Sequence, residues 1–359
     1  MLTRPVAQRR ARELFDLVAG FVYSQVLLAC VRLDLFGELS KGPQTLSDLA
    51  HRLGLPYESA RRLLAAATSL KLVERRSQGR YGLGVLGAAM VGNTAVAAMV
   101  EHHSALYADL ADPVALLRGE TDPASEANKC GGTPTGNGAR LASYWPYAGA
   151  QTPGSLAPEQ VSAYSALMSA SQPLVAHEIL DAYPLGGHSC LLDIGGGEGT
   201  FLMQVAQRAP HLKLCLFDLP AVADRARARF AMSGLADKAE AFGGDFLKDP
   251  LPEGADIATL VRVVHDHDDA RVLTLLRAVY AALKPGGTLL LAEPMAATSG
   301  AEPMGDAYFG FYLLAMGRGQ PRAPGELAEF LKNAGFQRVR LLRSRMPLQT
   351  RVLLAKKST

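Results

Sequence analysis

The feature that most constrains the fold is a regular alternation of short apolar runs and helical stretches over residues 161–359. After a first helix at 161–182, strands are predicted at 190–194, 213–218, 257–264 and 288–293. The tail adds a helix at 324–334 and two strands, at 338–342 and 350–355. Because strands that alternate with helices pair through crossovers, this order predicts an α/β fold, a doubly wound parallel sheet covered on both faces.

The first strand runs directly into a loop in which glycine occupies every second position, at Gly195, Gly197 and Gly199. Such glycines allow a sharp turn and let a ligand approach the backbone closely. A dinucleotide fingerprint would need its third glycine at position 200, and a phosphate loop would need a following Lys and Ser or Thr. Neither is present, and Asp193 and Glu198 would repel a pyrophosphate. The loop therefore predicts a ligand with a cationic amino-acid end and no phosphate, such as S-adenosylmethionine (SAM).

Further side chains fall where such a ligand would need polar and aromatic contacts. The second strand ends at Asp218, at a distance from the loop where a carboxylate accepts hydrogen bonds from both ribose hydroxyls. Asp245 and Phe246 follow the third strand, where the adenine would lie. Any one of these carboxylates could merely cap a helix. Their order along the chain predicts a SAM site: first the loop with Asp193, then Asp218, then the Asp245–Phe246 pair.

A histidine and a glutamate lie at the ends of the next two strands. The fourth strand runs into a stretch of histidines and aspartates that begins at His265, and the fifth ends at Glu293. Ligands of such sheets bind beyond the carboxyl ends of the strands, so His265 is predicted to be a general base that Glu293 orients. Asp268 or Asp269 is predicted to cap the next helix, and His267 to be a surface or capping side chain. No metal site is predicted, because no separate carboxylate cluster accompanies the stretch.

The N-terminal part predicts a helix at 45–55, a second helix at 56–70 and a hairpin at 72–83. This is a winged-helix pattern, and its two interpretations are DNA binding and a packing module. Arg61 and Arg62 are the main basic residues of the second helix, and the net charge of the chain is only +3. The packing module is therefore favoured, and no nucleic-acid partner is predicted.

Residues 17–31 form an uncharged apolar stretch behind a basic cluster of Arg4, Arg9, Arg10 and Arg12. A membrane span needs about 20 residues, and no small-residue cleavage pattern follows, as a signal peptide would require. The stretch therefore predicts a helix buried against another subunit. The four cysteines are scattered, without a CxxC pair, which is typical of a protein in a reducing cytoplasm.

Residues 119–158 are rich in Gly, Pro, Ser and Thr and include Trp145. This composition predicts a linker or a surface loop, with a lid over a pocket as the alternative. The predicted boundaries are a helical winged-helix dimerisation domain at 1–115, the linker or lid at 116–160 and the catalytic domain at 161–359.

These motifs resemble the caffeate-type family of small-molecule O-methyltransferases. The resemblance covers most of the chain: the winged-helix domain, the glycine loop, the His265–Asp266 pair and the strand that ends at Glu293. It implies a class I SAM-methyltransferase sheet of seven strands with the last antiparallel, and a homodimer with intertwined N-terminal helices. It also implies a metal-independent reaction that yields S-adenosylhomocysteine, with His265 as base and Glu293 as its orienting partner.

Three positions depart from the pattern of that family. His267 replaces the tryptophan of its His-Asp-Trp motif, Pro321 falls where plant members carry a second glutamate, and Val261 replaces a cofactor-contacting lysine. These departures argue against the phenolic substrates of the plant enzymes.

Within the family, the chain is most similar to the hydroxyneurosporene and demethylspheroidene O-methyltransferases of bacterial carotenoid synthesis. The similar stretches are residues 11–23, 260–269 and 305–319. The similarity implies methylation of the tertiary 1-hydroxyl of an acyclic carotenoid. The third stretch would give an apolar substrate pocket, formed by Tyr308, Phe309, Tyr312 and Met316. The alternative is that half of this aromatic run is simply core.

A hydrocarbon substrate must leave the bilayer, so the sequence predicts a cytoplasmic enzyme with peripheral contact to the inner membrane through its basic N-terminus. One alternative is an O-methyltransferase of a polyketide or a phenolic natural product. The alternatives from other classes are a SAM-binding protein that does not methylate and a winged-helix regulator.

Overall fold

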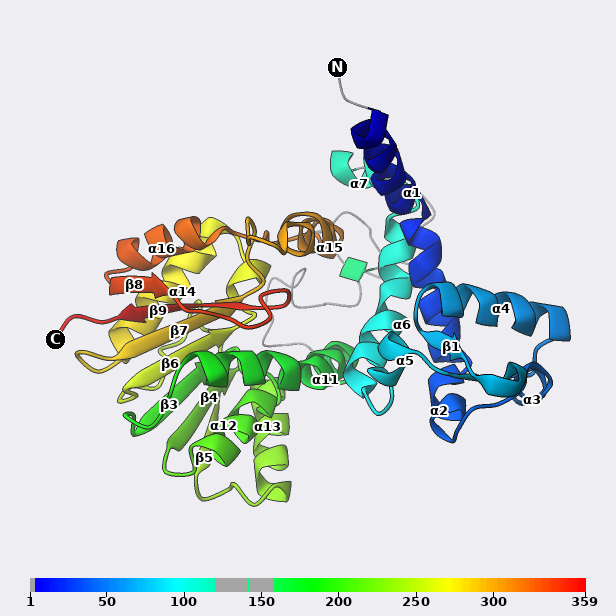
Figure 1. Cartoon of the computed structure of the whole chain (residues 1–359). Helices are drawn as coiled ribbons and strands as arrows, with labels where there is room; N and C mark the ends of the chain where they lie inside the picture. Colours follow the sequence, from blue (N-terminus) through cyan, green and yellow to red (C-terminus); the bar gives the residue numbers. More distant parts are fainter. Residues whose placement is uncertain (1–3, 120–140, 143–157) are drawn as a thin grey trace, which may run out of the picture. The chain divides into compact units, whose positions relative to one another are not determined.

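The computed structural model describes residues 4–119, 141–142 and 158–359 (Figure 1). The chain divides into two compact units, Met1–Ser104 and Ala105–Thr359. Most of the linker or lid predicted at 116–160, with Trp145, lies outside the described residues.

The N-terminal unit contains the helix-turn-helix and hairpin that its sequence pattern predicts. Its elements are α1 (Arg4–Arg32), α2 (Leu35–Ser40), α3 (Leu46–Arg52), α4 (Tyr57–Ser69), β1 (Val73–Arg75), η1 (Ser77–Gly79), β2 (Tyr81–Leu83) and α5 (Val85–Ala88). The start of α3 is set by Thr45, whose hydroxyl oxygen accepts the backbone N–H of Asp48 at 3.2 Å. Strands β1 and β2 pair antiparallel as the hairpin. Leu35, Leu49 and Leu64, all fully buried, hold these elements around one core.

Helix α1 leaves a row of large apolar side chains exposed along its N-terminal half. Phe15 is 73% exposed, Leu17 78% and Phe21 66%. The helix is longer than the apolar stretch from which it was predicted, and Val6–Arg32 is long and apolar enough to cross a membrane by length and composition. Core helices and signal sequences pass the same test. The length of residues 17–31 is therefore no argument against a span.

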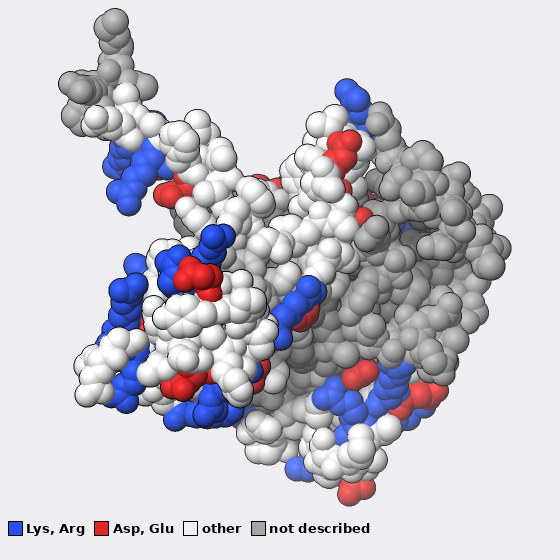
Figure 2. All heavy atoms as spheres, turned by 90° about the vertical axis from the view of Figure 1, so that its right-hand side faces the viewer, with Lys and Arg blue, Asp and Glu red and all other residues white. Residues whose placement is uncertain are grey.

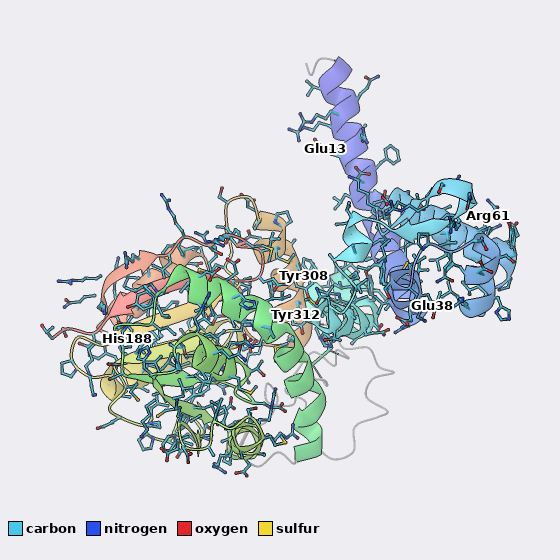
Figure 3. All side chains as sticks on the ribbon, turned by 60° about the horizontal axis from the view of Figure 1, so that its bottom comes forward. Glu13, Glu38, Arg61, His188, Tyr308 and Tyr312 are labelled. Carbon is cyan, nitrogen blue, oxygen red and sulfur yellow. The ribbon has the colours of Figure 1, made fainter. Side chains whose placement is uncertain are left out.

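Charged side chains of both signs are mixed on the N-terminal unit. Figure 2 shows Lys and Arg beside Asp and Glu on this unit, with uncharged surface between them. Arg61 on α4 pairs with Glu58 at 2.8 Å, and Glu38 pairs with both Lys41 and Arg52 (Figure 3). Arginines whose charge is already paired with a carboxylate contribute little to binding the phosphates of a nucleic acid.

The second unit is built on a seven-stranded sheet in its described residues, with the order β5-β4-β3-β6-β7-β9-β8. Its strands are β3 (Cys190–Ile194), β4 (Lys213–Asp218), β5 (Ala239–Gly243), β6 (Ile257–Val261), β7 (Thr288–Glu293), β8 (Gln337–Leu341) and β9 (Arg351–Lys356). Strand β9 is antiparallel to both of its neighbours, and the pairs from β5 to β7 are parallel. The predicted doubly wound methyltransferase sheet with its last strand antiparallel is confirmed.

Helices cover both faces of this sheet and enclose two cores. Helix α6 (Thr94–Asp109) crosses the boundary between the units. Besides the strands, the described residues of the second unit form α7 (Pro113–Arg118), α11 (Pro158–Ala182), α12 (Thr200–Arg208), α13 (Pro220–Met232), η3 (Val264–Asp266), α14 (Asp269–Ala282), η4 (Pro303–Phe309), α15 (Gly310–Met316) and α16 (Pro324–Asn333). Helices α11, α12 and α13 pack on one face, and α14 and α16 on the other (Figure 1). Successive residues of β3, Leu191 and Leu192, enter opposite cores, as the pleat of a strand requires.

The parallel strands bring their carboxyl ends to one edge of the sheet, where β6 ends earlier than predicted. The sequence predicted a strand to residue 264, but β6 ends at Val261. Arg262 takes a left-handed backbone conformation with φ 57°, and Val264–Asp266 then form a 3-10 turn. This turn changes the direction of the chain and places His265 at the carboxyl edge of the sheet.

Candidate active site

The three alternate glycines of the loop after β3 all have positive φ, between 58° and 80°. A Cβ on Gly195 would collide with the Val263 side chain, and one on Gly199 with the Phe230 ring. A Cβ on Gly197 would meet no described atom within 4 Å. Gly195 and Gly199 are therefore required by the turn and its packing, and Gly197 is the member of the loop that opens onto free space.

Asp193, the residue predicted to face a cationic group, is a buried carboxylate with one unsatisfied oxygen. Its Oδ1 accepts a hydrogen bond from the Thr259 hydroxyl at 2.6 Å, and its Oδ2 has no partner among the described residues. Burial, opposed by the Thr259 bond and reinforced by the charge of Asp218, raises the pKa of Asp193 to about 7. A buried carboxylate with an orphaned oxygen is the kind of group that a ligand ammonium would stabilise.

Asp218 ends β4 beside the same loop. One of its carboxylate oxygens accepts the N–H of Gly197 at 2.8 Å and the other accepts the N–H of Leu219 at 2.7 Å. Burial raises the pKa of Asp218 to about 6, although both backbone bonds act to lower it. Each oxygen keeps a second lone pair, so the group can still accept hydrogen bonds from a diol.

Asp245 and Phe246 lie at the turn after β5. The carboxylate of Asp245 accepts the N–H of Leu247 at 3.0 Å and pairs with Lys248 at 3.3 Å. The ring of Phe246 meets the His267 imidazole edge to face, with ring centroids 5.4 Å apart. His267 is not the surface or capping side chain that was predicted, because its Nδ1 is fully buried and burial lowers its pKa to about 4.

Glu198, the second acidic residue of the loop, forms ion pairs with two arginines of the protein. Its carboxylate pairs with Arg229 at 3.0 Å and with Arg225 at 3.5 Å, both on α13. Arg229 also bonds the Thr200 hydroxyl at 3.1 Å. Glu198 therefore connects the start of α12 to α13, whereas Asp193 keeps one oxygen with no partner among the described residues.

His265 and Glu293 meet at the ends of β6 and β7. The imidazole Nδ1 of His265 is hydrogen-bonded to Oε2 of Glu293. The other oxygen of Glu293 accepts the backbone N–H groups of Val263 and Val264 at 2.9 and 2.7 Å. Because Glu293 is an acceptor, Nδ1 carries the ring proton and Nε2 is the basic nitrogen. One buried carboxylate thus sets both the path of the turn and the orientation of the ring.

A second carboxylate lies on the other side of the imidazole. Oδ1 of Asp266 is 3.2 Å from Nε2 of His265, and burial raises the pKa of Asp266 to about 6. Burial alone would lower the pKa of His265, but Asp266 and Glu293 outweigh it and hold that pKa above its ordinary value. A protonated imidazole is therefore stabilised at this position, which is what a proton acceptor requires.

Arg262 is a residue that the sequence analysis passed over. Its guanidinium bonds the Ser171 hydroxyl at 2.8 Å and the Met168 carbonyl at 3.1 Å, both on α11, and also contacts Gln172. Its charge lowers the pKa of His265. A residue other than glycine rarely adopts the left-handed conformation, so the residue type of Arg262 did not indicate this turn.

Three of the four aromatic or apolar residues predicted for a substrate pocket gather near His265. Phe309 meets the His265 ring at a centroid distance of 6.3 Å, and Tyr308 stacks on Tyr312 at 5.8 Å (Figure 3). Met316 is only 2% exposed and packs with Leu106, Leu116 and Leu141. For Met316 the core interpretation is therefore favoured, and Tyr308 and Tyr312 are partly buried and pack against the same cluster.

Comparison with protein families assigns both parts of the chain. Residues 148–337 match the model of an O-methyltransferase domain, and residues 15–100 match the model of an O-methyltransferase dimerisation domain. The second match includes α1 from residue 15 onward, with the exposed Phe15, Leu17 and Phe21, and supports a homodimer.

Two bacterial proteins are similar to this chain over most of its length. The demethylspheroidene O-methyltransferase of Cereibacter sphaeroides is 43% identical over 339 residues, which is 94% of this chain and 85% of that protein. The protein of the same name from Rhodobacter capsulatus is 40% identical over 99% of this chain and 84% of its own. Among solved structures, human N-acetylserotonin methyltransferase in complex with SAM is similar, with 25% identity, a TM-score of 0.75 and 98% of both chains covered.

The contact between Glu293 and His265 predicts the response of the histidine to Glu293→Gln. The amide keeps the shape of the side chain but removes a negative charge that raises the pKa of His265, so that pKa should fall. An NMR titration of the labelled imidazole, assigned with a His265→Gln variant, measures the change without any ligand. Glu240→Gln, an exposed position on β5, is the control. An unchanged or raised pKa would contradict the contact as described.

Proposed function

This chain belongs to the family of SAM-dependent O-methyltransferases with an N-terminal dimerisation domain, and on that basis we propose that it methylates the tertiary 1-hydroxyl of an acyclic carotenoid. The observation that carries the substrate is the 43% identity to demethylspheroidene O-methyltransferase over 94% of the chain. The proposal also assigns His265 as the general base and Glu293 as the residue that orients it.

Four groups are proposed to hold SAM. The unsatisfied oxygen of Asp193 would receive the ammonium of its methionine part, beside the open position at Gly197. The lone pairs left on Asp218 would accept the ribose hydroxyls, and Asp245 with Phe246 would receive the adenine. Gly195 and Gly199 would contribute by shaping the loop rather than by contact.

When bound, SAM supplies a methyl group on a sulfonium, whose carbon–sulfur bond breaks as the acceptor oxygen forms its bond to carbon. In this displacement His265 takes up the hydroxyl proton at Nε2, and Glu293 and Asp266 stabilise the resulting imidazolium. Little charge is created, so positioning of the two reactants would supply most of the acceleration, on the order of 7–11 kcal/mol. The base would add about 10²–10⁴-fold.

The apolar side of the site suits a hydrocarbon acceptor. Phe309, Tyr308 and Tyr312 would line the path of the polyene next to His265. Burial raises the pKa of the Tyr308 hydroxyl, which leaves this side chain neutral. A polyketide or phenolic acceptor is the alternative, and comparative turnover separates the two.

A methyl-transfer assay tests substrate and base together. Methyl-labelled SAM is incubated with the purified protein and a detergent-dispersed panel of a 1-hydroxycarotenoid, a catechol and an anthracycline-like phenol. We expect label in the carotenoid, and a loss of about two orders of magnitude or more in His265→Ala. Label only in a phenol would discard the carotenoid. Full activity in His265→Ala would discard the base.

Burial of the carboxylates predicts how SAM affinity depends on pH. Asp193, with a pKa of about 7, and Asp218, with a pKa of about 6, must be ionised to hold the ligand. Affinity should therefore rise as the pH increases to about 7 and level off above it. The Asp193→Asn substitution should weaken SAM binding. The pH dependence of the affinity that remains should be confined to pH values below about 6. Calorimetry checks this, with the exposed Glu240→Gln as the control, and an unaltered profile in Asp193→Asn would refute the assignment.

We further propose that the protein is cytoplasmic and touches the inner membrane through the basic start of α1. Arg9 and Arg10 each pair with Glu13 on the same helix, at 3.0 and 2.9 Å, which partly neutralises the basic end. Glu13→Gln should therefore increase sedimentation with anionic liposomes, and deletion of residues 1–12 should reduce it. Sedimentation that survives high salt would contradict an electrostatic contact.

A further inference from the structure

The segment from Gly319 to Arg322 crosses directly against the turn that carries His265. It follows α15 and leads into α16, and its residues lie more than 50 positions after the turn in the sequence. The side chain of Arg322 is among the most buried charged groups of the described chain, at 4% exposure. A buried guanidinium is costly unless its donors are satisfied, so its contacts identify what it holds.

The guanidinium of Arg322 donates hydrogen bonds to two backbone carbonyls around His265 and to the carboxylate of Asp269. Its Nη1 donates to the carbonyl of Val264 at 3.1 Å, and its Nη2 donates to the carbonyl of His267 at 2.7 Å. Its Nε and Nη2 both donate to Oδ1 of Asp269, at 3.1 and 2.7 Å. The guanidinium therefore bridges the residues on both sides of His265 with the start of α14. Its plane is supported by the Phe330 ring, whose centroid is 5.5 Å away.

The backbone of the same segment contacts His265 itself. The N–H of Gln320 donates to the carbonyl of His265 at 2.9 Å. Gly319 has φ 84°, and a Cβ there would overlap this carbonyl. The segment thus touches His265 through a position at which only glycine fits.

The segment also reaches the loop after Glu293. The carbonyl of Arg322 accepts the N–H of Ala296 at 3.1 Å, three residues beyond the end of β7. Within the described residues, Gly319–Arg322 therefore binds the turn after β6 through one set of groups and the loop after β7 through another. His265 belongs to the first of these segments, and Glu293, the last residue of β7, immediately precedes the second.

We propose that Arg322 is a positioning residue that holds the turn of His265 and the loop of Glu293 in register, so that Nδ1 keeps its carboxylate and Nε2 faces the acceptor. The proposal rests on the proposed role of His265 as base. The planar fork of arginine reaches two carbonyls and a carboxylate at once, which a single ammonium cannot do. Arg322 contacts neither the His265 ring nor the Glu293 carboxylate, and acts on this pair through the carbonyls of Val264 and His267 and the carboxylate of Asp269.

The pH response provides a readout that a purely structural role would not move. His265 faces Glu293 from β7, Asp266 from its own turn, Arg262 from the end of β6 and the neutral imidazole of His267. Against burial and the charge of Arg262, the two carboxylates hold the pKa of His265 above its ordinary value. If the turn were loosened, His265 would lose part of its contact with the two carboxylates and its pKa would fall. The acid limb of the pH profile of kcat would then move to lower pH.

The decisive experiment compares Arg322→Lys with two matched variants. Asp269→Asn removes the exposed counter-ion and keeps both carbonyl bonds, and Arg277→Lys changes an exposed arginine on α14. We expect Arg322→Lys to lower kcat about 10- to 100-fold, to change the KM for SAM by less than about 3-fold, and to shift the acid limb downward. Asp269→Asn should cost less, and Arg277→Lys should match the wild type.

An NMR titration of His265 in the same variants separates this proposal from the proposed function, because it needs neither SAM nor acceptor. A lowered His265 pKa in Arg322→Lys supports the positioning role even if no acceptor is methylated. Gly319→Ala, which presses on the His265 carbonyl without altering Arg322, should give the same downward shift. Lost activity with an unmoved pKa and limb would mean that Arg322 only stabilises the fold, and would overturn the proposal. A fully active Arg322→Lys variant would also overturn the proposal.

Discussion

The buried hydrogen bond between Glu293 and His265 is the interaction on which the site depends. Glu293 ends a central strand, and its two oxygens hold the imidazole and the N–H groups of Val263 and Val264. A carboxylate that is 1% exposed persists only with such partners, since a buried unpaired charge costs several kcal/mol. The turn after β6 therefore has one stable path, and that path brings the ring over the carboxyl edge.

The other buried carboxylates of this edge are less well satisfied, and that difference has a chemical meaning. Asp193 and Asp218 have pKa values raised to about 7 and about 6 by burial. Without a ligand, each charge is held at an energetic cost that a cationic or hydroxyl-bearing partner would relieve. The unpartnered oxygen of Asp193 therefore leaves a cost in stability at the glycine loop that a bound ligand would offset, whereas Glu293 is satisfied by the protein itself.

Much of this arrangement was predictable from the sequence because parallel strands bring their carboxyl ends together. Asp193, Asp218, His265 and Glu293 each follow an apolar run, and that rule alone places them at one edge. The N-cap at Asp268 was predicted and is confirmed. The partners of Glu198 and the contacts of Arg322 were not predictable, because they lie about 30 and more than 50 residues away and depend on how helices pack. The left-handed turn at Arg262, which ended β6 early, has no signature in residue type.

The nature of the acceptor decides how much this positioning matters. A phenol, with a pKa near 10, gives up its proton with modest help, whereas a tertiary alcohol is far less acidic and stays protonated until its oxygen is already bonding to carbon. A base for such an alcohol must therefore be aligned during the displacement itself, not merely present nearby. Asp266 stands 3.2 Å from Nε2 and adds a second carboxylate beside the imidazole. In the proposed reaction, the carboxylates beside both ring nitrogens would stabilise the imidazolium that forms, and Arg322 would keep its turn in place during the transfer.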